Sequence, residues 1–219
     1  MSDGTSLAMR ELLFGDVAPD RWPEREDLTG EPWLSFIEAR RALGAGDRGA
    51  AIARLRTVLE QPNLESRQVL QAWHALRLAG EPPPAELAKR LEGVVVEVGL
   101  EGGLDLLAAY RDLSARYLSF SGAAIIWEHP DRSLDGDIEA LLSAGRHVVA
   151  AIGPWERPRP RPPGMGEVRI NFLTPSGLHF GQGPYRDLAS DGLGGPVLAA
   201  ALRLMQALIG KSGRGQPPR

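Results

Sequence analysis

The stretch that decides the fold is residues 93–127, GVVVEVGLEGGLDLLAAYRDLSARYLSFSGAAIIW. It opens with a run of valines, and β-branched side chains favour an extended strand. Gly102 and Gly103 both tolerate positive φ, so they suit a tight turn between two strands. Polar turns at 111–114 and 121–122 would reverse the chain twice more. We therefore predict an antiparallel meander of four short strands, at 94–98, 104–110, 116–120 and 123–127.

After the meander the helical period returns. Residues 135–152 carry apolar side chains on one side and two aspartates in the first turn, where the helix dipole favours negative charge. A second hairpin is expected at 168–180 around a turn at 175–177, followed by a nearly all-apolar helix that ends at Gly210. Because each helix has one apolar face, one face of the sheet can receive both. We predict an α+β fold with one domain over residues 93–210.

The chain before the meander has helical rather than extended character. Residues 31–91 contain three apolar stripes at helical spacing, separated by glycines and prolines that end helices. We expect this helical hairpin region to pack beside the α+β domain. Residues 1–30 are turn-rich, and we expect weak order there, while 211–219 has the composition of a disordered tail.

Part of the helical region has a pattern of small residues closed by a proline. The residues that carry this pattern are Ala42, Gly46, Asp47, Ala51, Leu55, Leu59 and Pro62. In this pattern, residues 36–80 resemble a tetratricopeptide-type helical hairpin, over a single repeat of about 34 residues. The resemblance implies a helical hairpin that can bind protein. Generic helical packing is the alternative interpretation, because such repeats usually occur in arrays of about three or more.

Composition excludes several kinds of chemistry. The 219 residues include no cysteine, which removes disulfides, thiolate catalysis and cysteine-ligated metal sites. The four histidines do not have the spacing of metal ligands, so we expect no metal and no cofactor. The sequence also lacks the nucleophile motif of the common serine hydrolases. These observations favour a non-catalytic protein over an enzyme.

Charge and segment length limit the expected partners. A net charge of −3 argues against a dedicated nucleic-acid binder. No apolar run reaches the roughly 18–20 residues that span a bilayer, and the first residues do not form a signal peptide. We therefore expect a cytoplasmic protein with no membrane partner. A homo-oligomer stays open, because exposed edge strands can pair with a second copy.

The most unusual segment is the loop at 153–163, GPWERPRPRPP. Repeated proline favours polyproline II, which is extended and low in entropy, and the last prolines fit a PxxP pattern that docks on aromatic-lined grooves. Tryptophan and arginine are enriched at binding hot spots. The candidate binding residues here are Trp155, Arg157, Arg159 and Arg161. A stiff spacer between helix and strand is the alternative interpretation of the same loop.

A second candidate site lies at 174–184, TPSGLHFGQGP, where glycines permit close approach to another molecule. If it binds a ligand, its pocket would be lined by Arg169, Asn171, His179 and Tyr185. A β-hairpin with a glycine-rich exit explains the same residues without a ligand.

Two hypotheses about function arise from these segments. The first is a non-catalytic cytoplasmic interaction protein, an adaptor or a subunit of a multiprotein complex, whose partner is another protein. The alternative is a small enzyme or ligand-binding domain with its site near the 174–184 hairpin.

Overall fold

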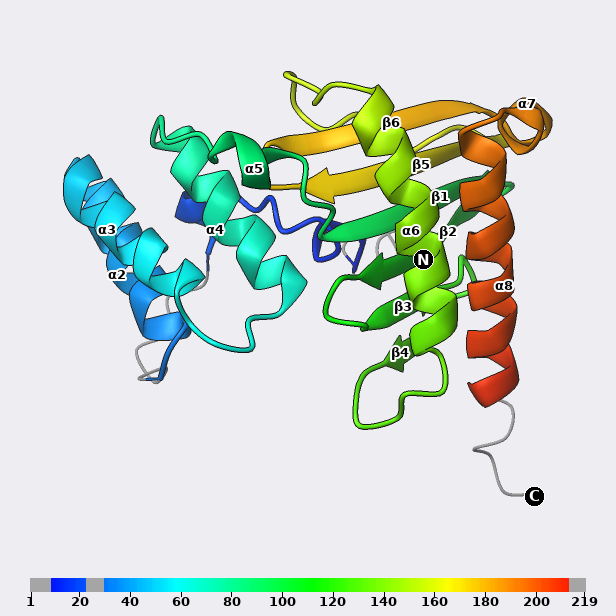
Figure 1. The fold of residues 1–219 in the computed structure, drawn as a ribbon, viewed down its shortest axis with the longest axis horizontal. Coiled ribbons are helices and arrows are strands. Elements are labelled where there is room, and N and C mark those ends of the chain that lie inside the picture. The colour runs from blue at the N-terminus through cyan, green and yellow to red at the C-terminus, as the bar shows by residue number, and fades with distance from the viewer. Residues whose placement is uncertain (1–8, 23–29, 213–219) are drawn as a thin grey trace.

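The computed structural model describes residues 9–22 and 30–212. They form a six-stranded antiparallel sheet with two long helices on one face and a group of shorter helices at its side (Figure 1). The predicted α+β class is confirmed, including the helical region beside the sheet.

The sheet combines the predicted meander with the later hairpin. Its order is β4-β3-β2-β1-β5-β6, so β5 pairs with β1 and extends the meander on its other side. The strands are β1 (Gly93–Leu100), β2 (Gly103–Tyr110), β3 (Ala115–Leu118), β4 (Ala124–Trp127), β5 (Glu167–Thr174) and β6 (Gly177–Pro184).

The last strand is longer than the sequence suggests. We expected an irregular glycine-rich exit after Phe180, but β6 continues to Pro184. Strand pairing uses backbone groups, so Gly181 and Gly183 pair with β5 although they have no side chains to pack.

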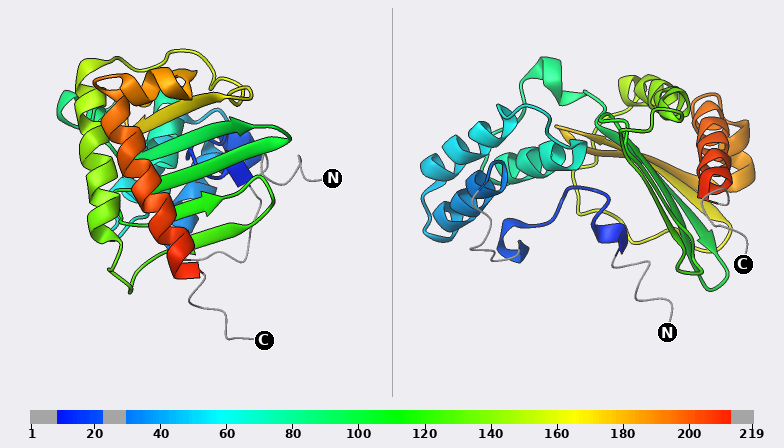
Figure 2. Two further views of the ribbon diagram at one scale, coloured as in Figure 1. Left: turned by 90° about the vertical axis from the view of Figure 1, so that its right-hand side faces the viewer. Right: turned by 90° about the horizontal axis from the view of Figure 1, so that it is seen from below.

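Two long helices, α6 (Asp135–Ala151) and α8 (Gly194–Ser212), cover one face of the sheet (Figure 2). The short α7 (Tyr185–Ser190) leads into α8. We expected α8 to end at Gly210, but the helix continues to Ser212. An interior glycine costs a helix only about 1 kcal/mol, and Gly210 is not among the glycines with positive φ.

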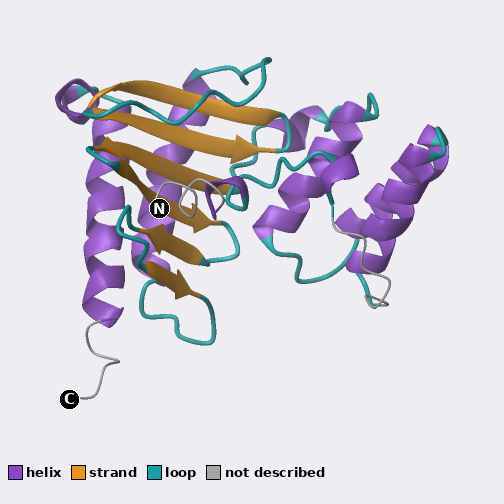
Figure 3. Cartoon of the chain, turned by 180° about the vertical axis from the view of Figure 1, so that it is seen from behind, coloured by secondary structure: helices purple, strands orange, loops and turns teal. Residues whose placement is uncertain are grey.

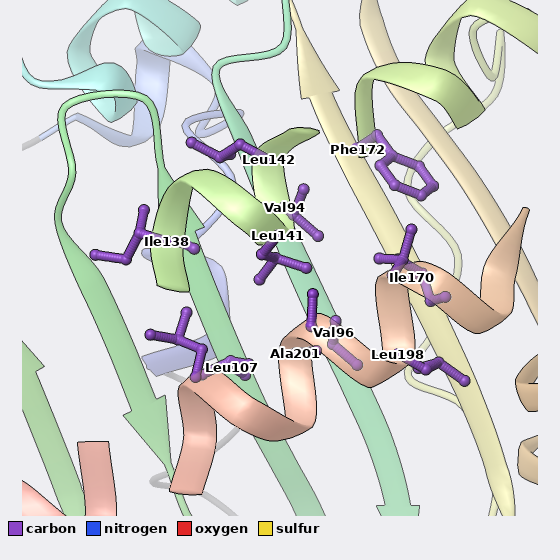
Figure 4. Close-up of a cluster of buried hydrophobic side chains, with 14 of the residues drawn as sticks. Val94, Val96, Leu107, Ile138, Leu141, Leu142, Ile170, Phe172, Leu198 and Ala201 are labelled. Atoms are coloured by element: carbon purple, nitrogen blue, oxygen red, sulfur yellow. The ribbon is translucent and has the colours of Figure 1, made fainter. Parts of the chain in front are cut away.

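The main core lies between this face and the two helices. Alternate residues of β1 and β5 point toward the helices, as period-two alternation requires. Figure 4 shows them meeting side chains from α6 and α8, and the cluster is buried. Its labelled members are Val94, Val96, Leu107, Ile138, Leu141, Leu142, Ile170, Phe172, Leu198 and Ala201.

The opposite face of the sheet is covered by the N-terminal segment 9–16 and by α4 (Ser66–Leu78). Leu13 and Phe14 are buried there against side chains of β1 and β2. The hydroxyl of Tyr110 donates a 2.7 Å hydrogen bond to the carbonyl oxygen of Leu13. The two faces of the sheet are therefore packed by different parts of the chain (Figure 2).

The helical region has a core of its own. It contains η1 (Pro19–Arg21), α2 (Trp33–Gly44), α3 (Arg48–Leu59), α4 and α5 (Ala85–Ala88). Buried side chains of α2, α3 and α4, among them Phe36, Leu55 and Leu76, form this cluster. In Figure 3 the region stands beside the sheet.

One polar link joins the helical region to the meander. The amide of Ser66 donates to Asp112 Oδ2 at 2.7 Å, and the amide of Asp112 donates to Ser66 Oγ at 3.0 Å. This exchange attaches the start of α4 to the β2–β3 turn. Within residues 9–22 and 30–212, none of the helices combines the length and apolar character needed to cross a bilayer.

Candidate functional site

A groove of about 790 Å³ lies where four segments meet. Its walls are residues 14–18, residues 70–78 of α4, the loop at 154–159 and the β5–β6 turn at 173–178. We call it the loop–hairpin groove. It brings together the two segments that the sequence analysis treated as separate candidates, the arginine–proline loop and the hairpin.

The loop wall is held by Trp155. Its amide donates a 2.6 Å hydrogen bond to the carbonyl oxygen of Leu178, on the outer edge of β6. Its ring packs edge-on against Phe180, with ring centroids 5.1 Å apart, and its indole NH donates to the Pro158 carbonyl oxygen at 3.1 Å. The Arg157 guanidinium lies 5.2 Å from the centre of the indole ring. Trp155 thus fixes the loop to the sheet edge while 37% of its surface stays exposed.

Arg159 turns inward rather than toward a partner. Its guanidinium donates to Glu11 at 2.7 Å and to Asp16 at 2.8 Å, and lies 4.0 Å from the centre of the Phe14 ring. Burial alone would lower the pKa of Arg159, but the two carboxylates outweigh it and raise that pKa. The side chain is only 11% exposed, so its charge attaches the loop to the N-terminal segment.

Beneath the loop lies a buried polar cluster, the Glu97 network, formed by Arg10, Glu97, Arg169 and Asn171. Glu97 opposes Arg169 across the β1–β5 pair. Its carboxylate accepts from Arg10 Nη2 at 3.2 Å, Arg169 Nη1 at 3.3 Å and Asn171 Nδ2 at 3.1 Å, and also from Arg10 Nε. Both arginines also donate to the carbonyl oxygen of Pro160 at 3.3 Å. The network therefore joins the N-terminal segment, the loop and the sheet.

The four residues expected around the hairpin do not share a pocket. Arg169 and Asn171 are buried in the Glu97 network. His179 lies opposite Phe172, which places it on the face covered by α6. Tyr185 begins α7 and is half exposed there.

Of the four loop candidates, three line the groove and one does not. Trp155 and Arg157 are exposed at its wall, and Arg159 forms part of the same wall from within. Arg161 is exposed but does not line the groove.

Sequence reasoning missed the contribution of α4. Its residues Leu70, His74, Arg77 and Leu78 line the groove, and Arg77 Nη1 donates to the Pro175 carbonyl oxygen. The sequence does indicate that these four residues share one face of a helix, because their positions follow the spacing i, i+4, i+7 and i+8. The contact of that face with the β5–β6 turn depends on the tertiary fold.

One serine–histidine pair lies beside the groove. Ser176 Oγ is 3.3 Å from His179 Nε2 and 2.9 Å from Thr174 Oγ1. Burial lowers the pKa of His179, and the charge of Lys89 lowers it further. A catalytic base must carry a proton during the reaction, and no carboxylate is among the influences that would stabilise the protonated ring.

Lowering the pH should destabilise the protein through two histidines, the buried His179 and the half-buried His74. Burial lowers the pKa of His74 and of His179 from the ordinary value of 6.5, and neighbouring cations add to the effect. Below that value the unfolded chain binds more protons than the folded one. The stability is therefore complete above about pH 6.5 and declines as the pH falls.

Urea denaturation at about pH 7.5 and about pH 5.5 tests this expectation. The free energy of unfolding should be lower at the acid value, and the difference should shrink in a His74→Gln, His179→Gln double variant. A double variant that keeps the whole pH difference would assign it to other groups.

The described residues contain no cluster of three or more histidines or carboxylates that could hold a metal ion.

Comparison of the chain with family models, curated proteins and solved structures gave no significant match.

Proposed function

We propose that this protein is a non-catalytic interaction protein, an adaptor or a subunit of a cytoplasmic complex, which holds a partner protein in the loop–hairpin groove. The observation that carries the proposal is the composition of the groove wall. Trp155, Arg157 and Leu78 all line the groove and are exposed, and Leu78 is 61% exposed. Tryptophan and arginine are the residue types most enriched at binding hot spots.

The fixed loop supports this function. A loop that must be ordered on binding costs affinity, whereas a preformed wall does not. Trp155 and Arg159 already attach the loop to β6 and to the N-terminal segment. Pro160 contributes its carbonyl oxygen to the Glu97 network and Pro163 is buried, so the PxxP stretch serves as part of the scaffold.

The helical region contributes the facing wall. α4 lies within the segment that resembles a tetratricopeptide-type hairpin, and its residues Arg77 and Leu78 face the loop across the groove. A protein-binding role for this hairpin is therefore part of the same proposal.

The test is affinity purification from the source organism with the tagged full chain and two matched variants. Leu78→Arg places a charge on the exposed rim of the groove, and Leu202→Arg makes the same change on α8, where the leucine is 42% exposed. A partner of the groove should be recovered at least about fivefold less with Leu78→Arg and normally with Leu202→Arg.

Both variants are first compared with the parent chain by thermal unfolding, so that loss of binding is separated from loss of fold. If every partner is recovered equally with the two variants, the groove is not the interaction surface. If partner recovery falls equally with Leu78→Arg and Leu202→Arg, the interaction surface is not specific to the groove.

A further inference from the structure

The charges around the loop–hairpin groove do not balance. Arg159 and Asp16 are paired with each other. Among the described residues, Arg77 and Arg157 form no ion pair. Apart from Asp16, the one carboxylate that lines the groove is Glu156, so one negative charge stands opposite these two positive charges. The groove therefore has a surplus of positive charge, although the chain as a whole is acidic.

Arg77 is the cation placed most favourably for a ligand. It is held by its Nη1 bond to the Pro175 carbonyl oxygen, and its guanidinium lies at the β5–β6 turn, near the position of Gly177. Burial lowers the pKa of Arg77 by more than the charge of Asp16 raises it, so the guanidinium has lost part of its hydration, and Asp16 itself is ion-paired with Arg159. Charge-assisted hydrogen bonds between arginine and carboxylate are among the strongest in proteins.

Apolar side chains lie next to this cation. Leu70 and Leu173 are buried in the lining, while Leu78 and Trp155 remain exposed at its rim. The outward carbonyl oxygen of Leu178 is already taken by the Trp155 amide. A bound chain would therefore be recognised by its side chains at this point rather than by strand addition to β6.

We infer that the loop–hairpin groove binds an extended acidic peptide segment of a partner protein, with an aspartate or glutamate side chain on Arg77 and a neighbouring bulky apolar side chain against Trp155. This inference rests on the proposed function, whose partner it describes chemically. Charge complementarity selects this occupant over a basic or a neutral segment.

The test starts from a phage-displayed library of random peptides of about twelve residues, panned against the full chain. Enriched peptides should contain an acidic residue close to leucine, phenylalanine or tryptophan. The best peptide is then synthesised, and its dissociation constant is measured by fluorescence anisotropy against the parent chain and the variants.

Arg77→Glu should weaken this peptide by at least about tenfold, and so should replacing its acidic residue by the matching amide. The second change leaves the protein untouched, so it keeps the inference testable if Arg77→Glu fails to fold. Against Arg77→Gln, the same amide substitution in the peptide should have an effect of about twofold or less. Arg203→Glu changes the net charge by the same amount at an exposed position of α8, so this control variant should bind the peptide normally.

Several outcomes would overturn the inference. The first is that panning enriches only neutral or basic peptides. The second is that acidic peptides are enriched no more on the parent chain than on the Arg77→Glu variant. The third is that a single-stranded oligonucleotide displaces the bound peptide at a lower concentration than the unlabelled peptide itself requires. If affinity purification finds a partner that depends on Leu78 while the enriched peptides are neutral, the binding function stands and only the acidic chemistry fails.

Discussion

Replacing Glu97 by alanine should lower the free energy of unfolding by about 3–5 kcal/mol, because it leaves two buried guanidinium groups without their carboxylate. Glu97 is fully buried, and Arg10 and Arg169 are each less than 5% exposed. Among residues 9–22 and 30–212, the one other carboxylate that pairs with either arginine is Glu11, which lies 3.3 Å from Arg10 and is shared with Arg159. Urea denaturation followed by circular dichroism measures the loss.

The same substitution should also open the loop–hairpin groove. Arg10 belongs to the N-terminal segment, and both arginines hold the Pro160 carbonyl oxygen of the loop. Without Glu97 the two arginines lose the carboxylate that joins them, although Arg169 keeps its hydrogen bonds to Gln182 and Arg10 keeps Glu11. Residues 9–16 and 154–163 should therefore exchange their amide hydrogens faster than they do in the parent chain. Hydrogen exchange measured by mass spectrometry reports on both segments separately.

Glu139→Ala is the matched control for Glu97→Ala. Glu139 pairs with Arg146 on the exposed side of α6, and an exposed ion pair contributes about 1 kcal/mol or less. Equal losses in the two alanine variants would show that the Glu97 network does not hold the segments together.

Much of the fold could be predicted because local chemistry and tertiary structure agree there. The valines of β1, the turn glycines Gly102 and Gly103, and the apolar stripes of α6 and α8 each indicate their element without long-range information. The insertion of β5 beside β1 depends on pairing between residues more than 70 positions apart, such as Glu97 and Arg169. No local pattern specifies that choice.

The candidate site shows how one residue of register matters. We expected a turn at 175–177, which would place His179 on the same face as Asn171 and Arg169. In the structure Thr174 pairs with Gly177, so the turn has two residues. A shift of one residue moves every following side chain to the opposite face of the sheet.

The loop was recognised from its unusual composition, but its role could not be. Arg157 and Arg159 look alike in the sequence, and each is followed by a proline. Only the tertiary structure distinguishes them, since Arg159 meets Glu11 and Asp16 of a segment that precedes it by more than 140 residues. Arg157 has the Trp155 ring beside it and remains exposed.

Replacing Phe172 by alanine should lower the free energy of unfolding by about 3–5 kcal/mol through the cavity that it leaves. Phe172 is 1% exposed and lies on the helix-covered face of β5 (Figure 4). Its ring lies close to α6 at Gly145, where an added Cβ would be only 3.2 Å from Phe172 Cδ1. The backbone of α6 is thus already near the sheet at this point, and the helix has little room to move in and fill the space.

Phe120→Ala makes the same change on the β3–β4 turn, where the ring is 43% exposed, and should lower the free energy of unfolding by about 1 kcal/mol.

Comparing Phe172→Ala with Glu97→Ala separates the effect on stability from the effect on peptide binding. Phe172 and Asn171 are neighbours on β5 that point to opposite faces, so Phe172→Ala should reduce stability yet leave the affinity of the folded protein for the acidic peptide within about twofold. Glu97→Ala should reduce both. A Phe172→Ala protein that stays folded at the temperature of the assay but loses the peptide would show that the two faces are not independent.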